Sequence, residues 1–314
     1  MTELSSATGP FASIEAVSEA LTARGYIPDR SLAITVFLAV RLGRPVFLEG
    51  EPGVGKTALA RALAEVLGSE LIRLQCYEGL DTHAALYEWN YPRQMLEVRL
   101  QEARGTARDR IGSDLFSEDF LLERPLLRAI RSHGPRPPVL LIDEVDRADE
   151  EFEAFLLEVL SEFQITIPEL GTLRARQVPI VVLTSNRTRE LHDALKRRCL
   201  YHWIDYPDVD KEIAIVRARL PGIEPRLAEQ LAYFMQRVRR EDLHKRPGVA
   251  DTIDWAEALL TLGVAELDAG TVEDTLACIL KYKADQDRLR SSGVARLLGE
   301  ARQAREFAAS PMTR

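Results

Sequence analysis

The sequence is poor in cysteine and lacks any cluster of cysteines at metal-binding spacing. Its three cysteines, Cys76, Cys199 and Cys278, lie far apart along 314 residues. Such scarcity excludes a disulfide framework and favours a reducing compartment. We expect each cysteine to be a small buried side chain rather than a reactive thiol.

Long apolar runs are also missing. The longest run, Leu32 to Val40, has Arg30 and Arg41 at its ends and is too short to cross a bilayer. The N-terminus does not show a basic region followed by an apolar core, which a signal peptide requires. We therefore expect a cytoplasmic protein without a membrane span.

An excess of basic residues is absent as well. The formal net charge is -8, which argues against broad electrostatic binding to nucleic acid, because such binding needs clustered Lys and Arg. The composition, 46% apolar and 29% charged, is that of a globular protein. A chain of this length favours two domains over one core.

One glycine-rich stretch stands out from this background. Residues 50–57 read GEPGVGKT and follow an apolar run at 45–48 that is typical of a short buried strand. Residues 58–67 then predict a helix that ends at Gly68. A strand, a glycine-rich loop and a helix form the context that this phosphate-binding pattern requires. The alternative is an ordinary glycine-rich turn before a helix.

The chemistry of this loop predicts binding of ATP with Mg²⁺. Gly50, Gly53 and Gly55 allow backbone angles at which successive N–H groups turn toward a phosphate, next to the positive end of a helix. Lys56 supplies a charge for the β- and γ-phosphates, and the Thr57 hydroxyl is suited to Mg²⁺. The nucleotide-binding candidates are consecutive: Gly50, Glu51, Pro52, Gly53, Val54, Gly55, Lys56, Thr57 and Ala58.

An acidic pair follows a second buried strand. Residues 139–142 form an apolar run that leads directly into Asp143 and Glu144. We predict that Asp143 holds Mg²⁺ together with Thr57, and that Glu144 acts as general base toward the attacking water. Asn186 ends another apolar strand and is a candidate to orient that water. The alternatives are a solvated acidic turn and an ordinary turn asparagine.

A basic run, Lys196 to Arg198, lies before the last predicted strand. Phosphoryl transfer needs a cation near the γ-phosphate, and a cation donated by a neighbouring subunit accelerates such reactions strongly. The run of Lys196, Arg197 and Arg198 is therefore a candidate to act on a neighbour's nucleotide. The alternative is a solvated basic helix end.

The segment from Tyr77 to Gly112 interleaves aromatic residues with arginines. Such a segment suits base stacking. The alternative is an insertion that packs on its own domain or contacts a protein partner. The net negative charge of the chain favours a protein partner, so we do not expect nucleic acid to be the ligand.

The order of the predicted elements indicates an α/β fold with a second, helical domain. We predict a P-loop nucleoside triphosphatase with a parallel five-stranded sheet flanked by helices and a C-terminal all-α lid. The expected divisions are a flexible N-terminus at 1–10, the α/β domain at 11–207 and the lid at 208–314. Helices are predicted at 11–25, 29–42 (buried on nearly every side), 58–67, 121–132, 149–163, 209–220, 226–239, 250–262, 272–281 and 294–307. Strands are predicted at 45–48, 71–76, 139–142, 165–167, 172–178, 179–184 and 200–204.

These motifs resemble those of AAA+ ATPases. The matching runs are GEPGVGKT, LLIDEVDRAD at 140–149 and VLTSN at 182–186, followed by a helical lid. The residues at 143–148, 156–158 and 161–162 are similar to the MoxR branch. The runs at 71–94 and 193–207 are similar to CoxD-type proteins, in which the ATPase assists maturation of a molybdenum hydroxylase, carbon monoxide dehydrogenase.

This resemblance implies a hexameric ring with nucleotide between subunits. It also implies that Arg198 is the first candidate, and Arg197 the second, for the arginine that acts in trans on a neighbour's nucleotide. It also implies that the aromatic insertion and the hairpin face a pore or client, and that a von Willebrand factor A-domain protein and a metalloenzyme client are partners. The chain departs from the family in the lid, where Asp251 stands near an expected arginine and Lys245 or Arg246 is the substitute candidate. Asp146 stands where the branch often has asparagine.

The sequence as a whole predicts Mg²⁺-dependent ATP hydrolysis by a MoxR-type AAA+ chaperone that remodels a client during metal-site maturation. The alternatives are a nucleic-acid motor or loader, a nucleotide-gated binding module with little turnover, and a small-molecule kinase.

Overall fold

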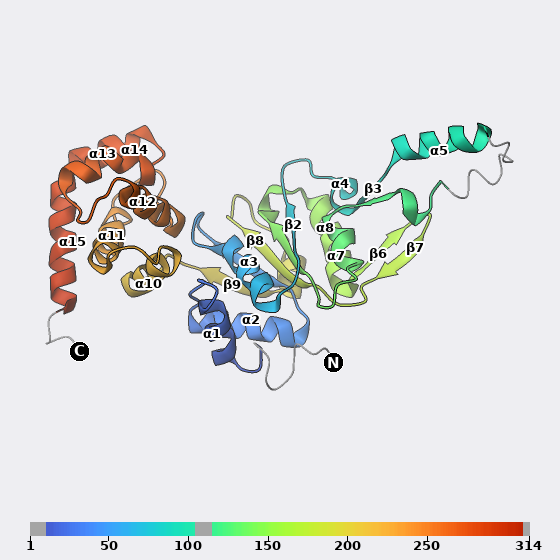
Figure 1. The fold of residues 1–314 in the computed structure, drawn as a ribbon, viewed down its shortest axis with the longest axis horizontal. Helices are drawn as coiled ribbons and strands as arrows, with labels where there is room; N and C mark the ends of the chain where they lie inside the picture. Colours follow the sequence, from blue (N-terminus) through green and yellow to red (C-terminus); the bar gives the residue numbers. More distant parts are fainter. Residues whose placement is uncertain (1–10, 104–114, 310–314) are drawn as a thin grey trace. The chain divides into compact units, whose positions relative to one another are not determined.

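The computed structural model describes residues 11–103 and 115–309, which form two units (Figure 1). Within these ranges, the α/β unit holds residues 11–24, 28–49, 57–103 and 115–203, and the helical unit holds 25–27, 50–56 and 204–309. The predicted flexible N-terminus, 1–10, and residues 104–112 of the predicted insertion lie outside the described residues. No described helix is long and apolar enough to cross a membrane.

The α/β unit is organised around one five-stranded sheet in the order β2-β5-β8-β1-β9. Its pairs β2–β5, β5–β8 and β8–β1 run parallel, which confirms the predicted sheet. The bounds are β1 Val46–Gly50, β2 Leu71–Gln75, β5 Val139–Asp143, β8 Ile180–Ser185 and β9 Leu200–Ile204. Every residue of β5 is buried, because helices cover both faces of a parallel sheet.

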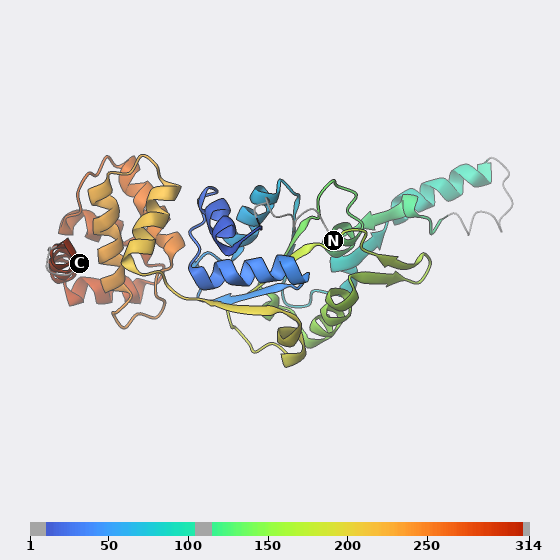
Figure 2. The same cartoon turned by 90° about the horizontal axis from the view of Figure 1, so that it is seen from below.

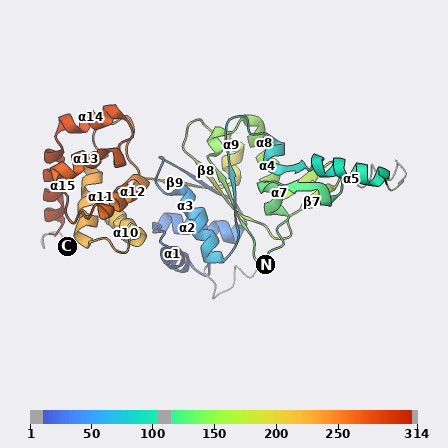
Figure 3. The same cartoon turned by 45° about the horizontal axis from the view of Figure 1, so that its top comes forward.

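Helices lie on the two faces of this sheet (Figures 1 and 3). One face carries α2 (Arg30–Leu42) and α3 (Lys56–Leu67), and the other carries α7 (Pro125–Ile130) and α8 (Glu150–Glu162). The remaining helices of the unit include α1 (Ile14–Thr22) and α9 (Asp193–Arg198). The prediction that the second helix is buried on nearly every side is wrong, because Leu38 and Leu42 of α2 are 38% and 59% exposed.

An insertion follows β2 and projects from the α/β unit (Figure 1). Its described elements are α4 (Thr82–Leu86), β3 (Tyr87–Trp89), α5 (Tyr91–Ala103), the 3-10 turn η2 (Glu118–Phe120) and β4 (Leu121–Glu123). The single helix predicted at 121–132 is wrong. Residues 121–123 instead pair with β3 in antiparallel register, and the helix begins at Pro125, a residue suited to the first helical position.

A short hairpin follows α8. It consists of β6 (Gln164–Ile167) and β7 (Gly171–Arg174), so its second strand ends before the predicted residue 178. Ile165 and Ile167 are buried in the core of the unit and anchor the hairpin there.

The helical unit contains six helices in its described residues (Figure 2). They are α10 (Val209–Arg219), α11 (Pro225–Val238), α12 (Val249–Thr261), α13 (Ala269–Ile279), α14 (Lys283–Ser292) and α15 (Val294–Ala309). Phe234 and Trp255 pack against each other in its core. The sequence did not predict α14, which buries only Asp285 and Leu289 and therefore has little amphipathic pattern.

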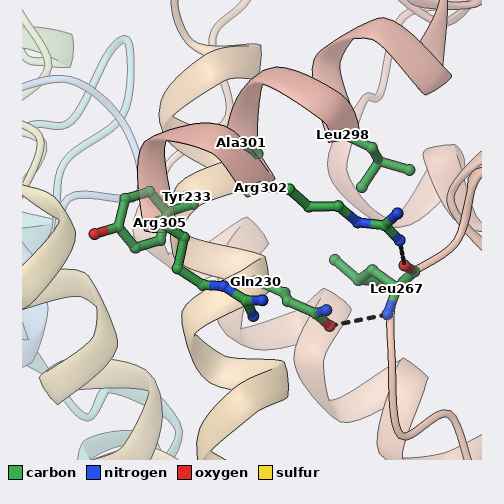
Figure 4. Close-up of a pocket in the computed structure, with 7 residues that line it drawn as sticks. All are labelled: Gln230, Tyr233, Leu267, Leu298, Ala301, Arg302 and Arg305. Atoms are coloured by element: carbon green, nitrogen blue, oxygen red, sulfur yellow. Dashed lines mark hydrogen bonds between the residues drawn. The ribbon is translucent and has the colours of Figure 1, made fainter. Parts of the chain in front are cut away.

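A small hollow lies between α11 and α15 of this unit (Figure 4). Polar contacts cross it: Arg302 donates a hydrogen bond to the Leu267 carbonyl (2.9 Å), and the Leu267 N–H donates to Gln230 Oε1 (3.0 Å). These bonds tie the segment before α13 to both helices.

Candidate nucleotide site

The glycine-rich loop after β1 has the backbone that a phosphate cradle needs. Gly53 and Gly55 have φ angles of 79° and 99°, which other residues rarely adopt. A Cβ on Gly50 would lie 2.2 Å from the Ile204 carbonyl oxygen. Side chains at these positions would therefore distort or displace the loop.

Lys56 closes this loop. Its ammonium donates hydrogen bonds to the carbonyls of Gly50 (2.7 Å) and Glu51 (2.8 Å), and the side chain is buried. Lys56 also begins α3, so the first N–H groups of the helix have no partner within the helix. The other candidates of the loop lie between these anchors, with Val54 buried and Glu51 exposed, while Pro52 is half-buried and Ala58 is exposed at the helix start.

Asp143 ends β5 and is the most completely buried carboxylate of the predicted site, at 2% exposure. Its Oδ1 accepts hydrogen bonds from the hydroxyls of Thr57 (3.0 Å) and Thr184 (2.6 Å). Its Oδ2 accepts from Arg73 Nε and Nη2 (3.1 and 2.6 Å). One oxygen is thus surrounded by hydroxyls and the other is paired with a cation.

Glu144 follows in a left-handed conformation, with φ 54° and ψ 50°. This conformation is unusual for a residue with a side chain. The Glu144 N–H donates to the Thr184 hydroxyl (2.9 Å), which in turn donates to Asp143. Thr184 therefore connects the two acids.

The Glu144 carboxylate is held by three donors. Oε1 accepts from Asn186 Nδ2 (3.2 Å), and Oε2 accepts from Gln75 Nε2 (3.1 Å) and Arg147 Nη1 (3.2 Å). The side chain is still 31% exposed, so water can reach it. The structure therefore brings together Thr57, Asp143, Glu144 and Asn186 at the carboxyl ends of adjacent strands.

Arg197 and Arg198 are not brought to these acids. Both are exposed at the end of α9, where Arg44 Nη2 donates to the Arg197 carbonyl (2.7 Å). Arg198 reaches α8 of its own unit, where it donates to the Leu157 carbonyl (3.3 Å) and to the Ser161 hydroxyl.

The lid candidates, Lys245 and Arg246, are exposed in the helical unit. The Lys245 N–H donates to Asp285 Oδ2 (3.2 Å), which fixes the backbone rather than the side chain. Asp251 accepts from the Gly248 N–H (2.8 Å) and so serves as a helix cap for α12. In the same unit, the Ala250 N–H donates to the Gly53 carbonyl (3.0 Å).

Five residues of this network were not selected as site residues from the sequence: Arg73, Gln75, Asp146, Arg147 and Thr184. Gln75 and Thr184 lie at or near the ends of strands that flank β5, as Asn186 does. The rule that ligands bind beyond the carboxyl ends of parallel strands would have found these two. Arg73 carries no comparable sequence signal.

The residues fit a Mg²⁺–nucleotide complex. Hydroxyl and carboxylate oxygens, the ligands that Mg²⁺ prefers, converge at Thr57 and Asp143. The loop fits phosphate, because its glycines leave room where a Cβ would collide.

The sheet order, the loop after β1 and the acids after β5 define a P-loop AAA+ fold. Residues 45–199 match the family model described as an AAA domain of the dynein-related subfamily.

The chain is also similar to known proteins and to solved structures. The gas vesicle ATPase GvpN of Haloferax mediterranei is 28% identical over 256 residues, which cover 78% of this chain and 70% of GvpN. The Lon protease of Halothermothrix orenii is 35% identical over 150 residues, 44% of this chain but only 16% of that protein. Among solved structures, RuvB of Thermotoga maritima matches 84% of this chain and 70% of RuvB, with 19% identity and a TM-score of 0.45.

Proposed function

We propose that this protein hydrolyses ATP with Mg²⁺. The observation that carries the proposal is the hydrogen-bonded network in which Thr57, Asp143, Glu144 and Asn186 meet at the ends of β5 and β8. Lys56 and Thr57 are consecutive in the chain, so the loop that cradles phosphate leads directly into this network.

Each residue has a role in this reaction. Main-chain N–H groups of the loop and the Lys56 ammonium bind the β- and γ-phosphates. Thr57 and Asp143 would hold Mg²⁺, which when bound neutralises charge on the transferred phosphate. Glu144 takes a proton from the attacking water, and Asn186 orients that water and the Glu144 carboxylate.

The direct test is the Glu144→Gln variant. Without a general base, phosphate release should fall by roughly 100-fold or more while ATP binding stays. Glu65→Gln, an exposed change on α3, is the matched control and should hydrolyse ATP like the wild type. Unchanged turnover in Glu144→Gln would remove Glu144 from the mechanism.

The proposal extends to a ring in which Arg198, and after it Arg197, acts on a neighbour's nucleotide. Both arginines are exposed at the end of α9, and the Arg198 side chain contacts α8 of its own subunit. Arg198→Ala should reduce hydrolysis in the assembled protein. Mixing Arg198→Ala with Lys56→Ala subunits should restore activity, because an intact site then forms between the two; absence of rescue would contradict a shared site.

The most specific part of the proposal is the identity of the client protein. The resemblance of residues 71–94 and 193–207 to CoxD-type proteins supports a MoxR-type chaperone that acts in maturation of a molybdenum hydroxylase such as carbon monoxide dehydrogenase, with a von Willebrand factor A-domain partner.

ATP-loaded Glu144→Gln protein should retain such a partner or client, and Lys56→Ala should not. DNA-stimulated hydrolysis would instead favour a nucleic-acid motor.

A further inference from the structure

Asp146 is a buried carboxylate that the proposed mechanism does not use. It lies in the 3-10 turn η3 (Val145–Arg147) after the acidic pair and is 2% exposed. A buried carboxylate is unfavourable unless it is paired or well hydrogen-bonded. Its partners therefore indicate why it is tolerated.

Within the described residues, the hydrogen-bond partners of the Asp146 carboxylate lie in the loop after β8. Its Oδ2 accepts hydrogen bonds from the N–H groups of Asn186 (3.2 Å) and Thr188 (2.8 Å) and from the Thr188 hydroxyl (2.7 Å). The Thr188 hydroxyl also lies within 3.2 Å of the Asp146 carbonyl oxygen. One side chain thus ties the loop from Asn186 to Thr188 to the turn after β5.

The loop has an uncommon shape that this carboxylate explains. Arg187, between the two N–H donors, is left-handed with φ 57°, and its own N–H donates to the Ser185 hydroxyl (3.0 Å). A left-handed residue other than glycine costs roughly 1–2 kcal/mol. In return, the N–H groups on either side converge on one anion, as in other main-chain anion sites. The Asp146 carboxylate takes the place of that anion.

Residues of one turn, Glu144 and Asp146, therefore hold both the main chain and the side chain of Asn186. Its main-chain N–H is bound by Asp146, and its side-chain amide is bound to Glu144 Oε1. If the main chain of Asn186 moves, its amide cannot keep the same direction toward Glu144.

We propose that Asp146 is a positioning residue that fixes Asn186 relative to Glu144; this inference rests on the proposed ATP hydrolysis for its kinetic consequence. The Asp146 side chain hydrogen-bonds to residues 186–188 rather than to Lys56, Thr57 or Asp143. Its removal should therefore lower kcat and leave ATP binding within about twofold. A misplacement of about 1 Å in a reacting group costs roughly 100-fold, so we expect Asp146→Ala to lower kcat about 10- to 100-fold.

The conservative variant separates positioning from general stability. In Asp146→Asn, the amide oxygen replaces Oδ2 as acceptor, and the NH₂ group replaces Oδ1, which has no hydrogen-bond partner among the described residues. Asp146→Asn should therefore keep most of the activity that Asp146→Ala loses. Asp149→Ala is the matched control, because Asp149 caps α8 through the Phe152 N–H (2.8 Å) and does not touch Asn186.

A double-mutant cycle tests whether Asp146 acts through Asn186. The kcat of Asp146→Ala/Asn186→Ala should equal that of Asn186→Ala alone. Multiplicative losses would overturn the inference, and so would a kcat of Asp146→Ala no lower than that of Asp149→Ala.

A second readout does not depend on hydrolysis. The chain contains only two asparagines, Asn90 and Asn186, so selective ¹⁵N-asparagine labelling gives two side-chain amide groups, assigned by Asn186→Ala. Asp146→Ala should shift the Asn186 main-chain and side-chain signals and leave those of Asn90 unchanged, whereas Asp149→Ala should leave both residues unchanged. Unshifted Asn186 signals in Asp146→Ala would overturn the inference even if ATP is hydrolysed. Shifted signals in a protein without ATPase activity would support the positioning contact and reject the proposed function.

Discussion

The two units bury charged side chains in different ways. In the helical unit, Arg239 and Glu212 form a bidentate pair (2.6 Å for each bond) with both side chains almost inaccessible. The Thr252 hydroxyl and Gln236 Nε2 also donate hydrogen bonds to Glu212, and Arg239 Nε donates to the Pro247 carbonyl. In the α/β unit, Asp143 is equally buried, but its neighbours Thr57 and Glu144 remain partly exposed.

This difference distinguishes a hydrogen-bond network that only stabilises the fold from one that can bind a ligand. A pair whose donors and acceptors bind one another has nothing left for a ligand. Carboxylates at strand ends that share hydroxyls and retain exposed neighbours can exchange those partners for a metal, a phosphate or water.

The largest expected effect is on stability and comes from disrupting the buried Arg239–Glu212 pair of the helical unit. Arg239→Met leaves Glu212 buried without its cation and should lower the free energy of unfolding by about 3–5 kcal/mol. Denaturant unfolding of the full chain measures this loss. The double variant Arg239→Met/Glu212→Leu should lose less, because no lone charge stays buried; a single-variant loss below about 1 kcal/mol would contradict the comparison.

Changes in the hydrogen-bond network around Asp143 should affect ligand binding more than folding. Asp143→Asn removes the charge that would hold Mg²⁺, and we expect Mg²⁺-dependent ATP affinity to fall roughly 10- to 100-fold, as for other changes around bound metals. Affinity measured with EDTA should stay the same. Asp287→Asn, a surface change on α14, is the control. An equal loss with and without Mg²⁺ would argue against a metal role for Asp143.

A smaller effect is expected where α12 begins against the phosphate loop. A Cβ on Gly248 would lie 2.7 Å from the Pro52 carbonyl oxygen and 2.9 Å from Gly53. Overpacking costs about 1–3 kcal/mol, so Gly248→Ala should weaken ATP binding by roughly tenfold in equilibrium titration. At Gly299 an added Cβ would meet no atom within 4 Å outside its own stretch of helix, so Gly299→Ala should bind ATP normally. Normal binding by Gly248→Ala would show that this contact does not shape the loop.

The smallest effect concerns the thiols. Burial, together with a smaller contribution from nearby acids, raises the pKa of Cys76 to about 12, and burial raises the pKa of Cys199 to about 12. Both are therefore neutral at pH 8 and should not react with iodoacetamide in the folded chain, whereas the partly exposed Cys278 is the expected site. Mass spectrometry after labelling measures this. Rapid native labelling of Cys76 would show that the end of β2 opens to solvent.

The fold was predictable where local pattern decides it. The apolar runs that became β1, β5 and β8 lie between turn signals, and each is buried in the parallel sheet. Residues 121–123 were misassigned as helix, because their strand exists only through pairing with Tyr87–Trp89, more than thirty residues earlier. The pattern at 283–292 is nearly all polar and gives no sign of α14.

The same distinction between local sequence pattern and tertiary structure applies to the candidate site. The loop residues and the acidic pair are contiguous in sequence, and their chemistry can be predicted from spacing. Arg73, Gln75 and Thr184 meet Asp143 or Glu144 only because β2 and β8 flank β5. Asp146 was visible as a departure from a family pattern, but its three bonds to the loop at 186–188 depend on tertiary structure.

Titration of Mg²⁺–ATP into the Glu144→Gln variant tests the account most directly, because binding is then measured without turnover. We predict saturable binding in the Glu144→Gln chain and its loss in the Lys56→Ala/Glu144→Gln double variant. If the folded Glu144→Gln chain shows no saturable binding at millimolar Mg²⁺–ATP, the loop does not hold a triphosphate and the proposed function is wrong.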